Sequence, residues 1–277
     1  MKKTVFFIEL MLLGAAGIFA QAETIKINSF NIQTFGEKKM NNPEVTSILV
    51  DIISKADITA IQEVRSAEIA PLLNFMGKLP PKYTYVLGPR EGRSPSKEQY
   101  WIIYDSTKLQ AIADTTWSDP DDIFERNPLG VYFQTAGSFD FILIDNHIQP
   151  TKAVREIDAM PEVVRYFQDI WSERDVILVG DFNADGTYYD EGLLTSVFPD
   201  NEYKIIITND FDTSVAIKDN TYDRIIITSS AIEDYASVCG VIRFDEIYDF
   251  PELMIRPKNV SDHYPVWAEF FLDADTD

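Results

Sequence analysis

Residues 176–185 of this 277-residue chain read Val-Ile-Leu-Val-Gly-Asp-Phe-Asn-Ala-Asp. The uninterrupted apolar run is typical of a buried strand, and Gly180 followed by Asp181 marks the point where that strand ends. Before it come an apolar run at 139–146 and a stretch with helical spacing at 152–171. A strand, a helix and a second strand in this order predict a unit that delivers Asp181 to the edge of a sheet.

An earlier segment of the chain repeats the same order of elements. An apolar run at 25–31, a helical pattern at 43–55 that begins with proline, and an apolar run at 58–61 lead to Gln62 and Glu63. Two halves of the chain could therefore bring polar side chains to one edge of a shared core. Layered α/β folds favour such strand ends as ligand sites.

Strands dominate the pattern along the rest of the chain. Apolar runs bounded by polar turns predict strands at 25–31, 58–61, 83–87, 100–104, 131–134, 139–146, 176–179, 225–227 and 266–271. Helical spacing predicts helices at 43–55, 68–76 and 152–171. The combined pattern predicts an α/β fold with two sheets packed face to face and helices outside.

The N-terminus has the features of an export signal. In residues 1–22, two lysines precede an apolar run that ends in small residues, so we expect a signal peptide that is cleaved near Ala22. A membrane anchor is the alternative, but the run is short against the ~20 residues of a spanning helix. Length and an apolar content of 45% favour one mature domain at 23–277 over two small ones. We expect a secreted protein, in the periplasm or the medium.

The chain is strongly acidic. Its formal charge is −21 at pH 7, and loss of residues 1–22, which contain two lysines and one glutamate, makes it −22. This charge alone predicts repulsion from nucleic acid and from anionic lipid. Bound cations can reverse the local field, so a metal site would reconcile the charge with a phosphate substrate. Cys239 is the single cysteine, which excludes an intramolecular disulfide.

Candidate catalytic side chains lie where apolar runs end. The chain has two histidines: His147 ends one run, and His263 precedes another. Either could be a structural histidine satisfied by hydrogen bonds. Acids and amides in comparable positions are Asn31, Glu63, Asp181, Asn183, Asp223 and Asp262. Mg²⁺ or Mn²⁺ prefers such oxygen ligands, although any single acid in so acidic a chain can equally cap a turn.

Five short segments combine these residues into longer patterns. They are Asn-Ser-Phe-Asn-Ile-Gln-Thr-Phe-Gly at 28–36, Ile-Gln-Glu-Val-Arg at 61–65, Gly-Asp-Phe-Asn-Ala-Asp at 180–185, Tyr-Asp-Arg-Ile at 222–225 and Ser-Asp-His-Tyr-Pro-Val at 261–266. In this order they resemble the signatures of the deoxyribonuclease I family, within the endonuclease/exonuclease/phosphatase superfamily. The resemblance covers residues 23–272 and implies a four-layer α-β-β-α sandwich with two central, mixed and mostly antiparallel sheets.

The resemblance also implies a role for each of these residues. His147 and His263 would be the acid–base pair around a scissile phosphate, the first oriented by Glu98 and the second by Asp223. Metal ligands would be Glu63, Asp181 and Asp262, with Asn31 and Asn183 assisting the metal or the phosphate. In-line attack by water needs a base, an acid on the leaving oxygen and positive charge, which this set would supply with one or two Mg²⁺ or Mn²⁺ ions.

Further family features are kept only in part. Arg65 and Arg126 match DNA-contacting arginines, although either could form an ordinary surface ion pair. Asp212 and Thr213 match part of a structural calcium site, so stabilisation by Ca²⁺ is a hypothesis. Ser96 stands where the family has a tyrosine that packs into the DNA minor groove, which weakens the expected grip on duplex DNA.

The sequence therefore predicts a secreted, divalent-metal-dependent endonuclease that hydrolyses double-stranded DNA as a monomer, without stable membrane association. The alternative is a phospholipid phosphodiesterase of the sphingomyelinase type on the same fold, which should expose an aromatic hairpin. Trp117 and Phe124 instead bracket an acidic loop. A non-enzymatic binding protein on a degenerate fold is a further alternative, and it predicts losses in the catalytic set, which is complete here.

Overall fold

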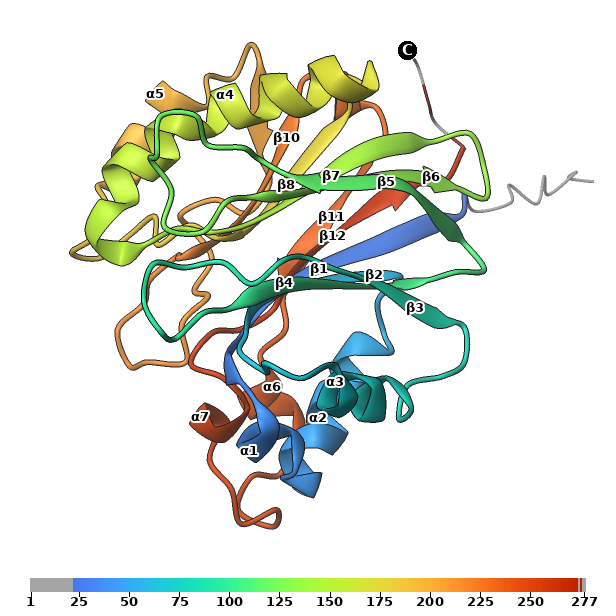
Figure 1. Cartoon of the computed structure of the whole chain (residues 1–277), viewed down its shortest axis with the longest axis vertical. Helices are drawn as coiled ribbons and strands as arrows, with labels where there is room; N and C mark the ends of the chain where they lie inside the picture. Colours follow the sequence, from blue (N-terminus) through green and yellow to red (C-terminus); the bar gives the residue numbers. More distant parts are fainter. Residues whose placement is uncertain (1–21, 274, 276–277) are drawn as a thin grey trace, which may run out of the picture.

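The computed structural model describes residues 22–273 and 275, and it contains two six-stranded sheets (Figure 1). The first sheet consists of β1 (Thr24–Phe35), β2 (Ile58–Val64), β3 (Tyr83–Leu87), β4 (Gln99–Asp105), β11 (Tyr235–Val241) and β12 (Val266–Phe271), in the order β11-β12-β1-β2-β4-β3. The second consists of β5 (Leu109–Thr116), β6 (Leu129–Thr135), β7 (Asp140–His147), β8 (Val176–Asp181), β9 (Tyr203–Ile205) and β10 (Asp223–Thr228), in the order β5-β6-β7-β8-β10-β9.

Helices cover the outer face of each sheet, which completes four layers (Figure 1). Those below the first sheet are α1 (Glu37–Met40), α2 (Pro43–Ile53), α3 (Ile69–Met76), α6 (Phe244–Ile247) and α7 (Pro257–Val260). Those above the second sheet are α4 (Ala153–Trp171) and α5 (Leu194–Val197). Three short 3-10 turns are η1 (Pro150–Lys152), η2 (Glu191–Leu193) and η3 (Ser230–Ile232). The predicted sandwich of two face-to-face sheets with outer helices is confirmed.

The predicted internal similarity between the two halves is also present. β1 and β2 are parallel and connected through α2, while β7 and β8 are parallel and connected through α4; the other strand pairs are antiparallel. Parallel strands end at the same edge of a sheet, so Asn31 pairs with Gln62 in one half and His147 pairs with Asp181 in the other. This arrangement brings polar residues from both sheets to one edge of the sandwich.

Local sequence explains why the connecting helices form where they do. Asn42 caps α2, with its side chain accepting a hydrogen bond from the Val45 backbone N–H at 3.1 Å, and proline occupies the first helical position. α4 buries one apolar face, which includes Ile157, Val164 and Phe167, against the second sheet. It ends at Ser172, whose φ of 57° is left-handed.

Apolar side chains fill three layers of core. One lies between the sheets and includes Phe133, Phe139 and Phe141, whose rings stack with centroids 4.9 and 5.7 Å apart. The others lie between each sheet and its helices, where the largest fully buried side chains include Trp101 and Phe167. These layers keep the two sheets, and therefore the two halves of the polar edge, in fixed positions.

Two expectations concern the part of the chain beyond the fold. The predicted signal peptide lies, except for Ala22, outside the described residues. Within residues 22–273 and 275, no helix combines the length and the apolar character that crossing a membrane requires.

Candidate active site

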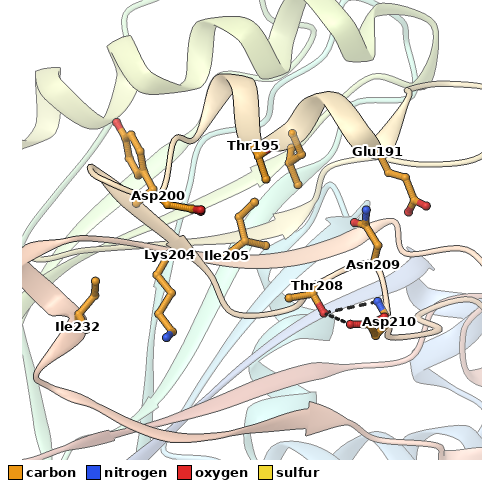
Figure 2. Close-up of a pocket in the computed structure, with 11 residues that line it drawn as sticks. Glu191, Thr195, Asp200, Lys204, Ile205, Thr208, Asn209, Asp210 and Ile232 are labelled. Carbon is orange, nitrogen blue, oxygen red and sulfur yellow. Dashed lines mark hydrogen bonds between the residues drawn. The ribbon is translucent and has the colours of Figure 1, made fainter.

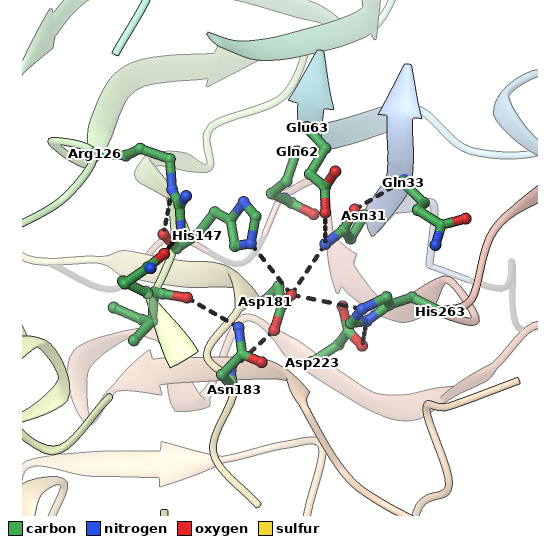
Figure 3. A network of polar contacts seen from close by, with 12 residues as sticks. Asn31, Gln33, Gln62, Glu63, Arg126, His147, Asp181, Asn183, Asp223 and His263 are labelled. Atoms are coloured by element: carbon green, nitrogen blue, oxygen red, sulfur yellow. Dashed lines mark hydrogen bonds and ion pairs between the residues drawn. The ribbon is translucent and has the colours of Figure 1, made fainter. Parts of the chain in front are cut away.

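The polar edge converges on one carboxylate, Asp181, at the end of β8 (Figure 3). Its Oδ2 atom lies 3.0 Å from the Asn31 amide nitrogen, 3.5 Å from His147 Nε2 and 3.6 Å from His263 Nε2. Asp181 and Asn31 belong to different sheets, so the contact joins the two halves of the sandwich. Both predicted catalytic histidines therefore point their Nε2 atoms at the same oxygen.

Gly180 allows this close approach of β7 and β8. Its φ is +137°, and a Cβ atom there would lie 1.9 Å from the carbonyl oxygen of Asn146. Only glycine tolerates both the backbone conformation and the contact. The Gly-Asp step that marked a strand end in the sequence is therefore what places Asp181 beside His147.

His147 is held by a buried carboxylate, as predicted. Its Nδ1 lies 2.5 Å from Glu98 Oε1, and its backbone N–H donates to the Tyr100 hydroxyl at 2.9 Å. Arg126 donates from Nε to the His147 carbonyl and lies 3.0 Å from Glu98 Oε1. Burial raises the pKa of Glu98, but His147, Arg126 and Arg65 outweigh it and lower that pKa to about 2. Glu98 is thus a permanent anion behind the imidazole.

His263 is also held by a carboxylate. This carboxylate is Asp223, which lies on the strand next to that of Asp181. The Nδ1 atom of His263 lies 2.9 Å from Asp223 Oδ2, and the His263 backbone N–H donates to Ser261 Oγ. Burial lowers the pKa of His263, but Asp223, Asp181 and Asp262 together raise it to about 10. Burial raises the pKa of Asp223, opposed by His263. The carboxylates favour an imidazolium here, and a cation bound among them would weaken that preference.

The first sheet contributes Glu63, which lies at the end of β2 in a left-handed conformation, with φ of 62°. Its Oε2 accepts hydrogen bonds from the Thr34 backbone N–H and from Arg65, both at 2.8 Å. Its Oε1 lies 3.4 Å from the Asn31 amide nitrogen. Glu63 is therefore connected to Asp181 through Asn31.

Asp262 completes the acidic side of the site beside His263. Its Oδ2 accepts a hydrogen bond from the Gln33 side chain at 2.7 Å, and its carboxylate side chain is 40% exposed. Asn183 lies deeper: its backbone N–H donates to Asp181 Oδ1, and its amide donates to the Ile148 carbonyl, both at 2.9 Å. The structure thus gathers the predicted histidines, carboxylates and amides into one site.

The donor set fits a divalent cation. Among the described residues, Asp181, Asp223 and His263 are the one group of three whose ligand atoms lie within 4.8 Å of one another. The Oδ1 atom of Asp223 is buried without a hydrogen-bond partner, which is costly unless a cation or a proton compensates it. This group shares only Asp181 with the predicted ligands, and Glu63 and Asp262 flank it. Mg²⁺ and Mn²⁺ prefer oxygen ligands, and this part of the site has more carboxylates than cationic side chains.

The two predicted DNA-binding arginines differ in exposure. Arg65 is a third exposed; it bridges Glu63 and Glu98 and donates to the Ser96 hydroxyl at 3.2 Å. Arg126 is only 9% exposed, so its main visible role is to hold Glu98 and the His147 carbonyl. Contact with DNA stays a prediction for both.

The predicted calcium residues have other partners. Asp212 accepts hydrogen bonds from the backbone N–H groups of Ser214 and Asn220, and its second oxygen lies 3.1 Å from Arg243. Thr213 Oγ1 accepts from the backbone N–H of Asp223 at 3.2 Å. Calcium binding at Asp212 would have to displace Arg243, and it stays a prediction.

Lys39 is a site residue that the sequence did not reveal. Its ammonium donates to the carbonyls of Ile32, Gln33 and Val260 at 2.5–2.8 Å. Burial lowers its pKa to about 8, opposed by Asp262 and Glu63. The bonds join the end of β1 to the segment that leads into Asp262. They also stabilise the irregular end of β1, where the left-handed residues Gln33 and Thr34 contact the two acids.

A second unpredicted pair ties the sheets together beneath the site. The Gln62 amide donates to Asp145 Oδ1 at 2.6 Å, and both side chains are fully buried. Burial raises the pKa of Asp145 well above its usual range, opposed by the hydrogen bonds from Gln62 and from the backbone N–H of Asn146. Because Gln62 precedes Glu63 and Asp145 is two residues before His147, the bond links the strands that carry both groups.

One surface hollow lies outside this site. A hollow of about 540 Å³ is lined by residues of η2, α5 and β9, among them Glu191, Thr195 and Lys204 (Figure 2). None of the residues that surround Asp181 lines it. The side chains of the candidate active site instead gather around Asp181 at the polar edge of the sandwich.

Two carboxylate-held imidazoles beside a carboxylate cluster that fits a divalent cation, on a two-sheet sandwich, are typical of a hydrolase of phosphate esters. Comparison with known proteins agrees: the sequence profile described as "Endonuclease/Exonuclease/phosphatase family" matches residues 29–263. The chain belongs to this family and is a deoxyribonuclease I-like member of it.

Individual relatives support this assignment along nearly the whole chain. Deoxyribonuclease-1 of Gallus gallus is 32% identical over 276 residues, covering 93% of this chain and 96% of that protein. Deoxyribonuclease-1 of Homo sapiens is 31% identical over 270 residues, covering 92% and 95%. The crystal structure of an endonuclease/exonuclease/phosphatase from Bacteroides vulgatus has a TM-score of 0.65 at 16% identity and covers 91% of this chain and 100% of that one. The last similarity concerns the fold alone.

Proposed function

We propose that this protein is a secreted, divalent-metal-dependent endonuclease that hydrolyses DNA phosphodiester bonds by histidine acid–base catalysis. One observation carries the proposal: His147 and His263 face the same oxygen of Asp181 with Nε2, at 3.5 and 3.6 Å, while carboxylates hold each Nδ1. Relatives named deoxyribonuclease-1 along more than 90% of the chain support DNA as the substrate.

The two imidazoles would act on opposite sides of a phosphate. One accepts the proton of the attacking water at Nε2, and the other donates a proton from Nε2 to the leaving oxygen. Glu98 and Asp223 fix the tautomer by occupying Nδ1 and stabilise each imidazolium as it forms. Asn31 would donate its amide to a non-bridging phosphate oxygen, since that amide already points toward the centre of the site.

A divalent cation would supply the positive charge that the transition state needs. We assign its ligands to Glu63, Asp181 and Asp262, with Asp223 and His263 close to Asp181. It would also offset the carboxylates that otherwise repel a phosphate in a chain of charge −21.

The sphingomyelinase-type alternative gains nothing from the structure. Insertion into a bilayer requires exposed aromatic side chains, whereas Trp117 is 7% and Phe124 is 2% exposed. The acidic loop that they bracket is tied to Arg93, which contacts Asp122 at 2.7 Å. The loop exposes Asp121 and Asp122, which are acidic and not aromatic.

The proposal is tested by nicking of supercoiled plasmid with the purified mature chain. Nicking with Mg²⁺ and Ca²⁺ that stops with chelator is the expected result. A parallel assay measures release of the sphingomyelin headgroup. Headgroup release without nicking would contradict the proposal in favour of the lipid substrate, and inactivity in both assays would contradict phosphodiesterase activity on either substrate.

A further inference from the structure

A row of aromatic side chains leads away from the catalytic centre. The Tyr222 ring lies 6.0 Å from the His263 ring, centroid to centroid, and the Tyr188 ring lies 6.0 Å beyond Tyr222. Tyr222 is close because Gly186 has no side chain: a Cβ there would meet the Tyr222 hydroxyl at 3.0 Å. Tyr188 is 41% exposed, at no more than about 12 Å from His263.

Tyr188 separates two shallow hollows of different charge. One, of about 440 Å³, is lined by Asp185, Asp190 and Glu191, which would repel a phosphate. The other, of about 400 Å³, is lined by Tyr188 and by the start of α4 and the turn before it, residues 151–155 and 158. The second hollow therefore has an aromatic wall and is lined by two cations, Lys152 and Arg155, and by one acid, Asp158.

The cations of this second hollow are partly available for a ligand. Arg155 is exposed, and no carboxylate of residues 22–273 or 275 lies within ion-pair distance of it. Lys152 is shared with Glu125, at 3.0 Å. Val154, which is 53% exposed, adds an apolar surface next to Tyr188.

We infer that the hollow between Tyr188 and Arg155 is a nucleotide subsite for the strand that runs out of the catalytic centre. The base stacks on Tyr188 and contacts Val154, while Arg155 contacts a backbone phosphate. The hollow is reached from His263 through Tyr222, and its first residue, Thr151, follows His147 by four positions. This inference rests on the proposed function, because it concerns how the same site holds its substrate.

The subsite contributes to substrate binding and not to the chemical step. Loss of a stacking side chain or a phosphate contact should therefore raise KM about tenfold and leave kcat within twofold. The effect should depend on substrate length, because the nucleotide bound at Tyr188 lies beyond those that flank the scissile phosphate. A dinucleotide does not reach the subsite, whereas a dodecamer does.

The experiment measures kcat and KM for a dodecamer and for a dinucleotide with wild type, Tyr188→Ala, Tyr188→Phe, Arg155→Gln and Arg165→Gln. Arg165 is the matched control: it is exposed on the same helix but ten residues further on, about 15 Å away. We expect a raised dodecamer KM for Tyr188→Ala and Arg155→Gln only. Arg155→Gln should also reduce the slope of log KM against log salt by about one.

The possible failures are distinguishable. If wild type cleaves the dodecamer and Tyr188→Ala has an unchanged KM, or if Arg165→Gln equals Arg155→Gln, the subsite is refuted while the nuclease proposal stands. If wild type cleaves neither substrate, the proposed function fails. Fluorescence anisotropy of a labelled dodecamer with wild type and Tyr188→Ala then decides the subsite alone, since equal affinities would refute it. Melting temperatures show whether each variant is folded.

Discussion

Replacing Glu98 by glutamine separates the orientation of His147 from the charge behind it. The Glu98 side chain is 5% exposed, with Oε1 2.5 Å from His147 Nδ1 and 3.0 Å from Arg126 Nε. Glutamine keeps the size and an oxygen acceptor but loses the negative charge. Burial raises the pKa of Glu98, but its partners lower it overall from 4.5 to about 2, which at about 1.36 kcal/mol per unit is a net stabilisation of the carboxylate by about 3 kcal/mol.

An imidazolium that forms on His147 during proton transfer would lose most of that stabilisation in Glu98→Gln. We therefore expect kcat for cleavage of a labelled duplex to fall about 10²-fold, with KM changed only a few-fold. Acid unfolding gives an independent measurement. A lowered carboxyl pKa adds stability above pH 4.5 that is lost as pH falls towards 2, so wild type should lose up to about 3 kcal/mol in this range that the variant does not lose.

The matched control is Glu91→Gln, because Glu91 pairs with Glu98 in an isolated bridge between backbone segments but does not contact His147. Circular dichroism and melting temperature establish that both variants fold. A kcat for Glu98→Gln within threefold of wild type would refute the reasoning about charge. An equal loss in Glu91→Gln would show that the loop, and not the carboxylate, is responsible.

Three further predictions follow from the same site. His263→Ala should lower turnover by about 10²–10⁴-fold with folding intact, and an unchanged rate in the plasmid assay would exclude the proposed mechanism. Lys39→Met leaves three carbonyls without their donor, so the free energy of unfolding in urea should fall by about 2–3 kcal/mol. The Mg²⁺ concentration for half-maximal activity should rise. An unaltered Mg²⁺ titration would contradict the positioning of Glu63 and Asp262 by Lys39. Burial raises the pKa of Asp145, and a raised carboxyl pKa costs stability as pH rises above 3.8. Asp145→Asn should therefore gain stability relative to wild type between pH 4 and 8, and parallel pH profiles of urea unfolding would contradict a raised pKa at Asp145.

The central strands were predictable because they are buried on both faces. β7 and β8 present continuous apolar runs, and the parallel pairs follow from strand–helix–strand order. The strands that the sequence did not predict, β5, β9 and β11, all lie at edges of the two sheets. In β11 the exposed positions interrupt any alternation, because an edge strand buries less of its surface.

The chemistry of the site was predictable only where side chains act directly. His147, His263 and the acids have recognisable motifs, and their meeting follows from parallel strands that end at one edge. Lys39 acts through backbone carbonyls, and its partners depend on left-handed residues at Gln33 and Thr34 that no local pattern indicates. Tertiary contacts between the sheets, such as Gln62 with Asp145, leave no periodic signal either.

The acidity of the chain becomes intelligible once the positions of its charges are known. At the catalytic edge, arginines neutralise acids that serve the histidines, as Arg126 does for Glu98 and Arg65 for Glu63. Asp181 and Asp262 have no lysine or arginine within ion-pair distance among the described residues. On the proposed function these two acids lie where the phosphate would approach, so the site would favour a phosphate only with a cation bound. A uniformly basic surface would bind nucleic acid without a metal, whereas the proposed mechanism makes substrate binding itself depend on metal.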